Sequence, residues 1–162
     1  QKQTSGSVIT TSQPSPGDVT AMWDRLLSCH EEIVFIPMSS GLSNTCQTAL
    51  ILAGSSPYQG RVHIVDNHRI SITQALSVLD AKALAEEGLS GAEIKAVLEK
   101  EAMDATIYIA VDTLEYLKKG GRITPAAAAI CTMHRPKPAL TIQGDQLATS
   151  ANAGDSTSVV DT

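Results

Sequence analysis

The stretch "EIVFIPMSSGLSNTCQTALILAG" (32–54) joins an apolar run, a loop of hydroxyl-bearing residues and a helical pattern. The run 32–38 is almost continuously apolar and rich in residues that favour strands, as is typical of a strand buried on both faces. The part 43–54 reads as a helix that starts at Ser43 and ends at Gly54. A strand, a loop and a helix in this order predict one unit of a layered α/β fold.

The segments on either side repeat this alternation. Apolar, strand-like runs lie at 61–66 and 106–112, and helical patterns at 18–29, 72–88 and 90–102. We expect Asp18 to cap the first helix, Gly88 to stop the second, and Ser90 with Glu93 to form a capping box on the third. The fold class that follows is α/β, with a mostly parallel sheet flanked by helices.

The pattern changes near the C-terminus. Residues 124–133 predict a short helix, and "KPALTI" (137–142) and "QLATSA" (146–151) flank a turn signal, as in a β-hairpin. Antiparallel strands after a parallel block indicate the start of a second, α+β domain. The expected division is therefore residues 1–122 and residues 123–162, with a loose polar tail at the end.

Composition restricts the classes of partner. The chain has 162 residues and a net charge of −5, and it contains no block of basic residues. Nucleic-acid phosphates require clustered Lys and Arg, so a nucleic-acid partner is not expected. No apolar run approaches the roughly 20 residues that span a bilayer, so stable membrane insertion is not expected either. Aromatic residues make up only 3%, which predicts an aliphatic core.

The three cysteines show no pairing or metal-binding pattern. Cys29, Cys46 and Cys131 are far apart and odd in number. They form neither a C-x-x-C pair nor a zinc spacing. We therefore expect buried free thiols in a reducing, cytoplasmic environment.

The hydroxyl loop is the first candidate site. Ligands of open α/β sheets lie beyond the carboxyl ends of the strands, where the loop 39–45 is expected. Ser40, Ser43 and their neighbours precede a helix, and hydroxyl donors beside the N-terminus of a helix suit a carboxylate or a phosphate. Equally, Ser43 could serve only as the N-cap of that helix.

The basic stretch "LKKGGRI" (117–123) is a second candidate. Gly120 is expected to follow a short helix as its C′ residue, with Arg122 just beyond it. The stretch could bring the backbone close to a ligand, or it could simply be a solvated helix end. It is not a phosphate loop, a G-x-S-x-G motif is absent, and the four histidines show no ligand spacing. The sequence therefore predicts no catalyst, metal or cofactor.

Six segments, in order, resemble the DegV family of bacterial lipid-binding proteins. They are "TSQPSPGD" (11–18), "SSGLSNTCQTA" (39–49), "VDNHRIS" (65–71), "LAEEG" (84–88), "VDTLEYLKKGGRI" (111–123) and "KPALTI" (137–142). The resemblance covers residues 10–143, and the first and fifth segments are long and unusual enough to be specific.

This resemblance implies a two-domain α/β protein that holds one long-chain fatty acid between its domains. Such a protein is the non-catalytic, acyl-binding subunit of a bacterial fatty acid kinase, and a separate kinase subunit phosphorylates the bound acid. The resemblance implies that Thr11 and Ser43 contact the carboxylate and that Arg122 lies near the ligand entrance. With Ser40 of the same loop, these residues form the predicted ligand-binding set.

The chain departs from the family pattern in three places. Asn44 and Cys46 replace a glycine and an aromatic residue beside Ser43. The segment after residue 147 lacks a basic stretch that the family pattern implicates in kinase docking. Family members also have a further N-terminal segment and a long second domain, so we expect a chain that is truncated at both ends.

Three functions therefore compete. The chain is a lipid carrier that serves a kinase, an acyl-transfer or hydrolytic enzyme that uses Ser43, or a structural domain whose hydroxyls are caps. The ordered motifs favour the carrier, and a serine without a neighbouring general base in its motif argues against the enzyme.

Overall fold

The computed structural model describes residues 10–111, 113–123, 139–143 and 146–149. Its elements, in chain order, are α1 (Pro16–Leu27), β1 (Ile33–Phe35), α2 (Thr45–Ala53), β2 (Val62–Ile64), α3 (Ser71–Glu86), α4 (Gly91–Lys100), the 3-10 turn η1 (Ala102–Asp104), β3 (Tyr108–Ala110), α5 (Glu115–Lys119), β4 (Ala139–Gln143) and β5 (Gln146–Thr149). The expected helix at 124–133, the tail beyond 149 and Cys131 lie outside the described residues.

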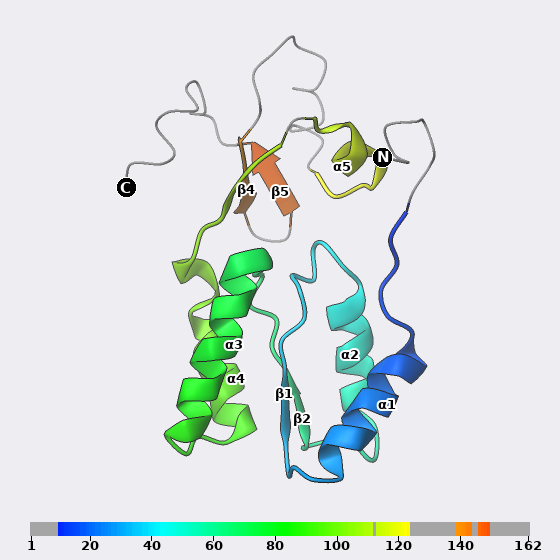
Figure 1. Ribbon diagram of the computed structural model, residues 1–162, viewed down its shortest axis with the longest axis vertical. Coiled ribbons are helices and arrows are strands. Elements are labelled where there is room, and N and C mark those ends of the chain that lie inside the picture. Colours follow the sequence, from blue (N-terminus) through cyan, green and yellow to red (C-terminus); the bar gives the residue numbers. More distant parts are fainter. Residues whose placement is uncertain (1–9, 112, 124–138, 144–145, 150–162) are drawn as a thin grey trace.

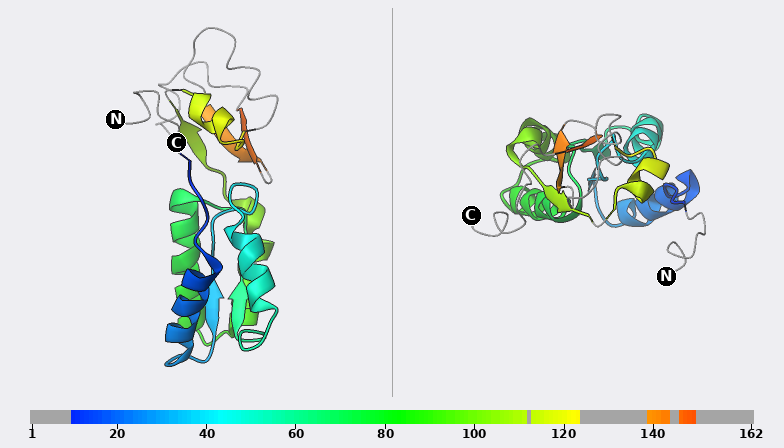
Figure 2. Two further views of the ribbon diagram at one scale, coloured as in Figure 1. Left: turned by 90° about the vertical axis from the view of Figure 1, so that its right-hand side faces the viewer. Right: turned by 90° about the horizontal axis from the view of Figure 1, so that it is seen from above.

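Strands β1 and β2 form the parallel layer of the fold. They pair in parallel, with Ile33 opposite Val62 and Phe35 opposite Ile64. Helices α1 and α2 lie to one side of these strands and α3 and α4 to the other (Figure 1). The side view shows helices in front of and behind the strands (Figure 2). The predicted α/β class with a parallel sheet flanked by helices is confirmed.

The third strand differs from the expectation. Residues 106–112 were expected to extend the parallel sheet, but β3 pairs antiparallel with β4, and β4 with β5. The apolar composition of a strand reports its burial and not the direction of its partner, so the sequence does not separate the two cases. The hairpin of β4 and β5 is confirmed. The division into two domains after residue 122 stays a prediction. Strand β3, which precedes this division, shares a sheet with β4 and β5, which follow it.

The main core lies between α1, α2 and the parallel strands. Trp23 has no exposed surface and contacts Phe35 and Tyr58 edge-to-face, with ring centroids 5.6 and 5.2 Å apart. The Tyr58 hydroxyl donates to Asp24 Oδ1 at 2.8 Å, which satisfies the one polar atom of its ring. One tryptophan thus anchors α1 to the sheet in a core that is otherwise mostly aliphatic.

The helix ends confirm two of the three predicted signals. Ser90 and Glu93 form the capping box of α4, and Gly88, with φ of +92°, follows α3 in the left-handed conformation. Asp18 is not the cap of α1. The N-cap is Ser15, three residues earlier than expected, and its side chain accepts a hydrogen bond from the Asp18 amide at 3.2 Å.

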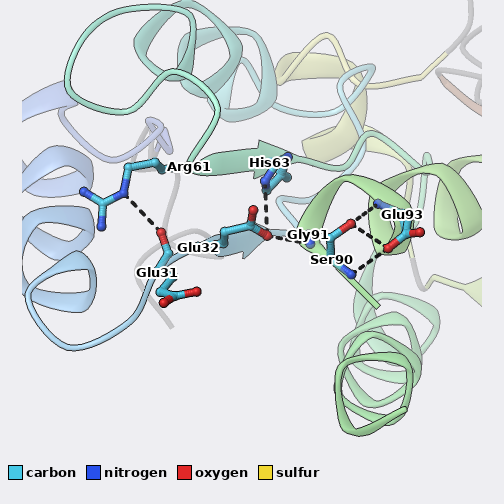
Figure 3. A network of polar contacts seen from close by, with 7 residues as sticks. All are labelled: Glu31, Glu32, Arg61, His63, Ser90, Gly91 and Glu93. Carbon is cyan, nitrogen blue, oxygen red and sulfur yellow. Dashed lines mark hydrogen bonds and ion pairs between the residues drawn. The ribbon is translucent and has the colours of Figure 1, made fainter. Parts of the chain in front are cut away.

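A polar network joins the beginnings of the two parallel strands to α4 (Figure 3). Glu32 Oε2 accepts a hydrogen bond of 2.7 Å from the Gly91 amide and lies 3.6 Å from His63 Nε2. Nearby, Arg61 Nε donates to the Glu31 carbonyl at 3.1 Å. This network lies far from the carboxyl ends of the strands, and the side chain of His63 is only 14% exposed within it.

Gly91 is the close-packed point of this network, and we predict that Gly91→Ala destabilises the fold. A Cβ atom there would collide with His63 Cδ2 and lie 2.8 Å from Glu32 Oε2. We expect a loss of about 1–3 kcal/mol in the free energy of unfolding, as for other overpacked sites. Urea titration followed by circular dichroism measures it.

Gly17 provides the matched control, because it also lies in the first turn of a helix. A Cβ atom at Gly17 would meet only Ser15 Oγ, at 3.9 Å. Gly17→Ala should therefore be neutral or slightly stabilising. Equal effects of the two substitutions would contradict the close packing at Gly91.

Candidate functional site: a cleft beyond the parallel strands

A cleft of about 950 Å³ lies beyond the carboxyl ends of β1 and β2. In Figure 1 the loops that follow these strands point toward α5 and the antiparallel sheet. The structure brings together all four residues that the sequence nominated, because Thr11, Ser40, Ser43 and Arg122 each line this cleft. They come from the segment before α1, from the β1–α2 loop and from the residues after α5.

Much of the remaining lining is aliphatic. The apolar side chains on the wall are Met38, Leu42, Ile70, Ile109, Val111 and Leu117. Leu42 also belongs to a buried cluster with Leu114, Ile123 and Leu140, so this wall continues into a packed core. The cleft therefore offers an apolar surface next to a group of hydroxyls.

The hydroxyl loop is held in place by the neighbouring β2–α3 loop. The Ser39 amide donates to the Arg69 carbonyl at 2.9 Å, and the Ser40 amide donates to Asp66 Oδ1 at 3.4 Å. Arg69 is itself buried, and its guanidinium donates to Ser77 Oγ at 3.0 Å. These contacts hold the loop 39–45, which lines the cleft, against the β2–α3 loop.

Ser43 supports the start of α2. Its Oγ accepts a hydrogen bond of 3.2 Å from the Thr45 amide and lies 2.8 Å from Thr45 Oγ1. The N-cap residue is Asn44, one position later than expected, and its side chain makes no capping bond. Two hydroxyls that share one hydrogen bond use only one of their two hydrogens. The Ser43–Thr45 pair therefore caps the helix and still has one O–H to donate.

Thr11 and Arg122 are in direct contact. Arg122 Nη2 donates to Thr11 Oγ1 at 3.3 Å, and Arg122 Nε donates to the Leu42 carbonyl, also at 3.3 Å. That Arg122 lies near a ligand entrance stays a prediction, and the structure shows that it touches Thr11, one of the predicted head-group hydroxyls. The left-handed residue after α5 is Gly121, with φ of +67°, and not Gly120, which has φ of −80°.

The two cysteines in the described part of the chain differ. Cys46 is completely buried, and burial, followed by the negative charge of Asp66, raises the pKa of its thiol to about 12. Cys46 thus stays protonated and acts as a small apolar residue. Cys29 is exposed, so the prediction that it is buried is wrong. Cys29 lies two residues after the end of α1, at the surface of the protein.

Several cleft residues escaped the sequence-based prediction. Gln13, Met38 and Tyr116 line the cleft. Gln13 lies within the "TSQPSPGD" motif, and Thr48 of α2 donates to its Oε1 at 3.1 Å. Met38 ends the apolar run of the first strand, so its position at the carboxyl edge was the available signal.

The described residues show neither a metal-binding cluster nor a membrane-spanning helix. They contain no group of three or more His, Cys, Asp or Glu side chains that could hold a metal ion. None of the helices among them is both long enough and apolar enough to cross a bilayer.

By fold and cleft, the molecule is of the layered α/β class in which ligand sites lie beyond the carboxyl ends of parallel strands. The chain belongs to the DegV family, because the family model described as "Uncharacterised protein, DegV family" matches residues 1–161.

Curated relatives from several bacteria share the sequence. A DegV domain-containing protein of Deinococcus radiodurans is 32% identical over 141 residues, which cover 87% of this chain and 50% of the relative. Protein DegV of Bacillus subtilis is 33% identical over 133 residues, or 81% of this chain and 47% of the relative. The chain thus spans about half the length of the curated relatives it matches.

Solved structures share the fold. A DegV family protein from Thermus thermophilus, whose structure is described as "Fatty Acid Binding", is 35% identical with a TM-score of 0.80, covering 92% of this chain and 53% of that one. Bacillus subtilis DegV, described as a fatty acid binding protein, is 27% identical with a TM-score of 0.70, covering 85% of this chain and 49% of that one.

Proposed function

We propose that this protein binds a long-chain fatty acid in the cleft and presents its carboxyl group to a separate kinase, which forms the acyl phosphate. The observation that carries the binding proposal is the cleft itself, in which Thr11, Ser40, Ser43 and Arg122 lie beside an aliphatic wall. Relatives described as fatty acid binding proteins support the same ligand class.

The two parts of the cleft suit the two parts of a fatty acid. Each methylene group that moves from water to the aliphatic wall contributes about 0.8 kcal/mol. The carboxyl group that follows the chain into the cleft needs hydrogen-bond donors, since an unpaired polar group costs several kcal/mol to bury. The hydroxyls of Thr11 and of the Ser43–Thr45 pair provide such donors.

An enzymatic use of Ser43 is less well supported. The partners of its hydroxyl are the amide and the hydroxyl of Thr45, and neither is a general base. A purely structural role explains the capping bonds of Ser43, but it does not explain why Thr11 and Ser40 line the same cleft. We therefore propose a binding protein that has no turnover of its own.

Organic extraction of the purified protein followed by mass spectrometry tests the ligand. We expect a copurifying long-chain fatty acid, and we expect acyl phosphate from ATP only when a fatty acid kinase subunit is added. Acyl phosphate formed by this protein alone would argue for an enzyme. Repeated preparations without lipid, and without binding of added fatty acid, would remove the proposal.

The head-group contacts lead to a further prediction. Thr11→Val and Ser43→Ala each remove one hydroxyl, and each should weaken fatty acid binding by about 1–3 kcal/mol, because the carboxyl group loses a donor. Titration with a fluorescent fatty acid measures this loss. Because Ser43 also caps α2, thermal unfolding of each variant must accompany the titration.

Thr20→Val is the matched control for this pair of substitutions. The Thr20 hydroxyl donates to the Pro16 carbonyl within α1, and the residue does not line the cleft. Its replacement should leave the affinity unchanged. If Thr11→Val and Ser43→Ala bind as tightly as this control, the hydroxyls serve only local structure.

A further inference from the structure

Arg69 is a buried arginine that has no ion-pair partner among the described residues. It is only 8% exposed, and no described carboxylate lies within ion-pair distance of it. Its guanidinium donates instead to the Glu101 carbonyl at 2.6 Å and to Ser77 Oγ at 3.0 Å. Glu101 is the C-cap of α4, so the cation lies at the negative end of that helix. These contacts compensate a charge that is otherwise costly to bury.

Ser77, the second acceptor, connects Arg69 to the interior of α3. The Ser77 side chain has no exposed surface, and its Oγ also accepts from Asn67 Nδ2 at 2.8 Å and donates to the Thr73 carbonyl at 3.1 Å. One serine hydroxyl can accept two hydrogen bonds and donate one, so its capacity is fully used. Arg69 thus joins two helices, α3 through Ser77 and α4 through Glu101.

The backbone on both sides of Arg69 has a conformation that residues other than glycine rarely adopt. His68 has φ of +56° and Ser71 has φ of +52°, and both values lie in the left-handed region. Such residues persist only where the surrounding structure imposes their conformation. Arg69 lies between them, and its contacts with α3 and α4 hold the β2–α3 loop in this shape.

The hydroxyl loop 39–45 is bonded to the backbone of Arg69. The Arg69 carbonyl accepts a hydrogen bond of 2.9 Å from the Ser39 amide. The Ser39 carbonyl in turn accepts from the amides of Leu42 and Ser43, at 3.0 and 3.2 Å. The position of the Arg69 carbonyl therefore sets the turn that carries Ser43. Ile70, the residue after Arg69, lines the same cleft.

From this chain of contacts we propose that Arg69 is a positioning residue of the cleft. Its guanidinium fixes the β2–α3 loop to α3 and α4, and its carbonyl transmits this order to the loop 39–45. Arg69 is not among the residues that line the cleft, so in this role it does not touch the ligand. The inference rests on the proposed function only for the identity of that ligand.

Native-state amide exchange, followed by NMR on the 162-residue chain, tests the proposal. Arg69→Met keeps much of the side-chain volume and removes the donors. The loop amides, which are those of Ser39, Leu42 and Ser43, should then exchange about tenfold faster relative to a reference amide, as for loss of hydrogen bonds from a charged group. The reference is the amide of Ile94, a buried residue that is hydrogen-bonded within the first turn of α4.

Two further variants separate positioning from general destabilisation. Ser77→Ala removes one acceptor of Arg69 and should accelerate exchange of the loop amides at least about threefold, but by less once Arg69→Met is present. Arg61→Met is the matched control, because Arg61 also donates to backbone carbonyls, from the end of α1 to the start of β1. It should change the ratio of loop to reference exchange by less than about twofold.

Equal acceleration of the loop amides and the reference amide by Arg69→Met would overturn the proposal, because Arg69 would then only stabilise the fold as a whole. Circular dichroism shows whether this variant is folded. If it is unfolded, Ser77→Ala decides, and an unchanged ratio of loop to reference exchange in that variant overturns the proposal.

Added hexadecanoic acid separates this inference from the proposed function. An acid that binds only the ordered loop should slow exchange of the loop amides by a similar factor in the wild-type chain and in Arg69→Met, because binding stabilises the ordered state alone. If the acid slows no exchange in the wild-type chain while Arg69→Met still accelerates it, the proposed ligand is wrong and the positioning role of Arg69 stands.

Discussion

Replacing Trp23 by alanine is expected to lower the free energy of unfolding by about 3–5 kcal/mol, the largest effect of any single change considered. Trp23 has no exposed surface and fills the space between α1 and the parallel strands. Its removal leaves a cavity that Phe35 and Tyr58 now border. Because Trp23 is the only tryptophan of the chain, denaturant unfolding should be followed by circular dichroism rather than by fluorescence.

Two controls separate the cavity from other causes. The Trp23 indole N–H has no hydrogen-bond partner within the described residues, so Trp23→Phe loses volume but no hydrogen bond and should cost clearly less. Met22, the preceding residue, is 48% exposed, and Met22→Ala should change stability by about 0.5 kcal/mol or less. A loss below about 1 kcal/mol for Trp23→Ala would contradict the packing described for α1.

The affinity for fatty acids should depend steeply on chain length. Shortening the ligand from hexadecanoic to dodecanoic acid removes four methylene groups, and at about 0.8 kcal/mol each this weakens binding by about 3 kcal/mol, or roughly two-hundredfold. The physical reason is that the proposed function places the acyl chain, and not the head group, against the aliphatic wall of the cleft. Displacement of a fluorescent acyl probe by a series of saturated acids measures the increment per methylene group.

Substitutions on the cleft wall test whether this increment arises in the cleft. Met38 lines the cleft and is 40% exposed, so Met38→Gln should reduce the increment without unfolding the protein. Met22→Gln, at a comparably exposed methionine outside the cleft, should not change it. An affinity that is independent of chain length would mean that the aliphatic wall is not the acyl site.

Local signals in the sequence predicted two helix ends whose stabilising contacts are local. The capping box of Ser90 and Glu93 joins residues three positions apart, and Gly88 ends α3 through its own backbone conformation. The same local reading misplaced the cap of α1, because Ser15 and Asp18 both carry a suitable oxygen and lie within one turn. The alternation of apolar runs with helical patterns was also enough to predict the α/β class.

Only part of the arrangement of the candidate site could be predicted from such local signals in the sequence. The strand-to-helix order placed the loop of Ser40 and Ser43 at the carboxyl edge of the sheet, where the cleft lies. Nothing in that order indicates that Thr11 and Arg122, 111 positions apart, form a hydrogen bond. The family resemblance indicated that both residues matter, but not that they touch.

The sequence by itself thus indicated helices α1 to α4, the capping box of α4, the stop after α3 and the parallel pairing of β1 and β2. Only the tertiary structure decided that β3 runs antiparallel to β4 and that Arg122 contacts Thr11. The reason is physical. Periodicity and capping depend on hydrogen bonds and burial within a few residues, whereas strand direction and the cleft depend on how whole elements pack against one another.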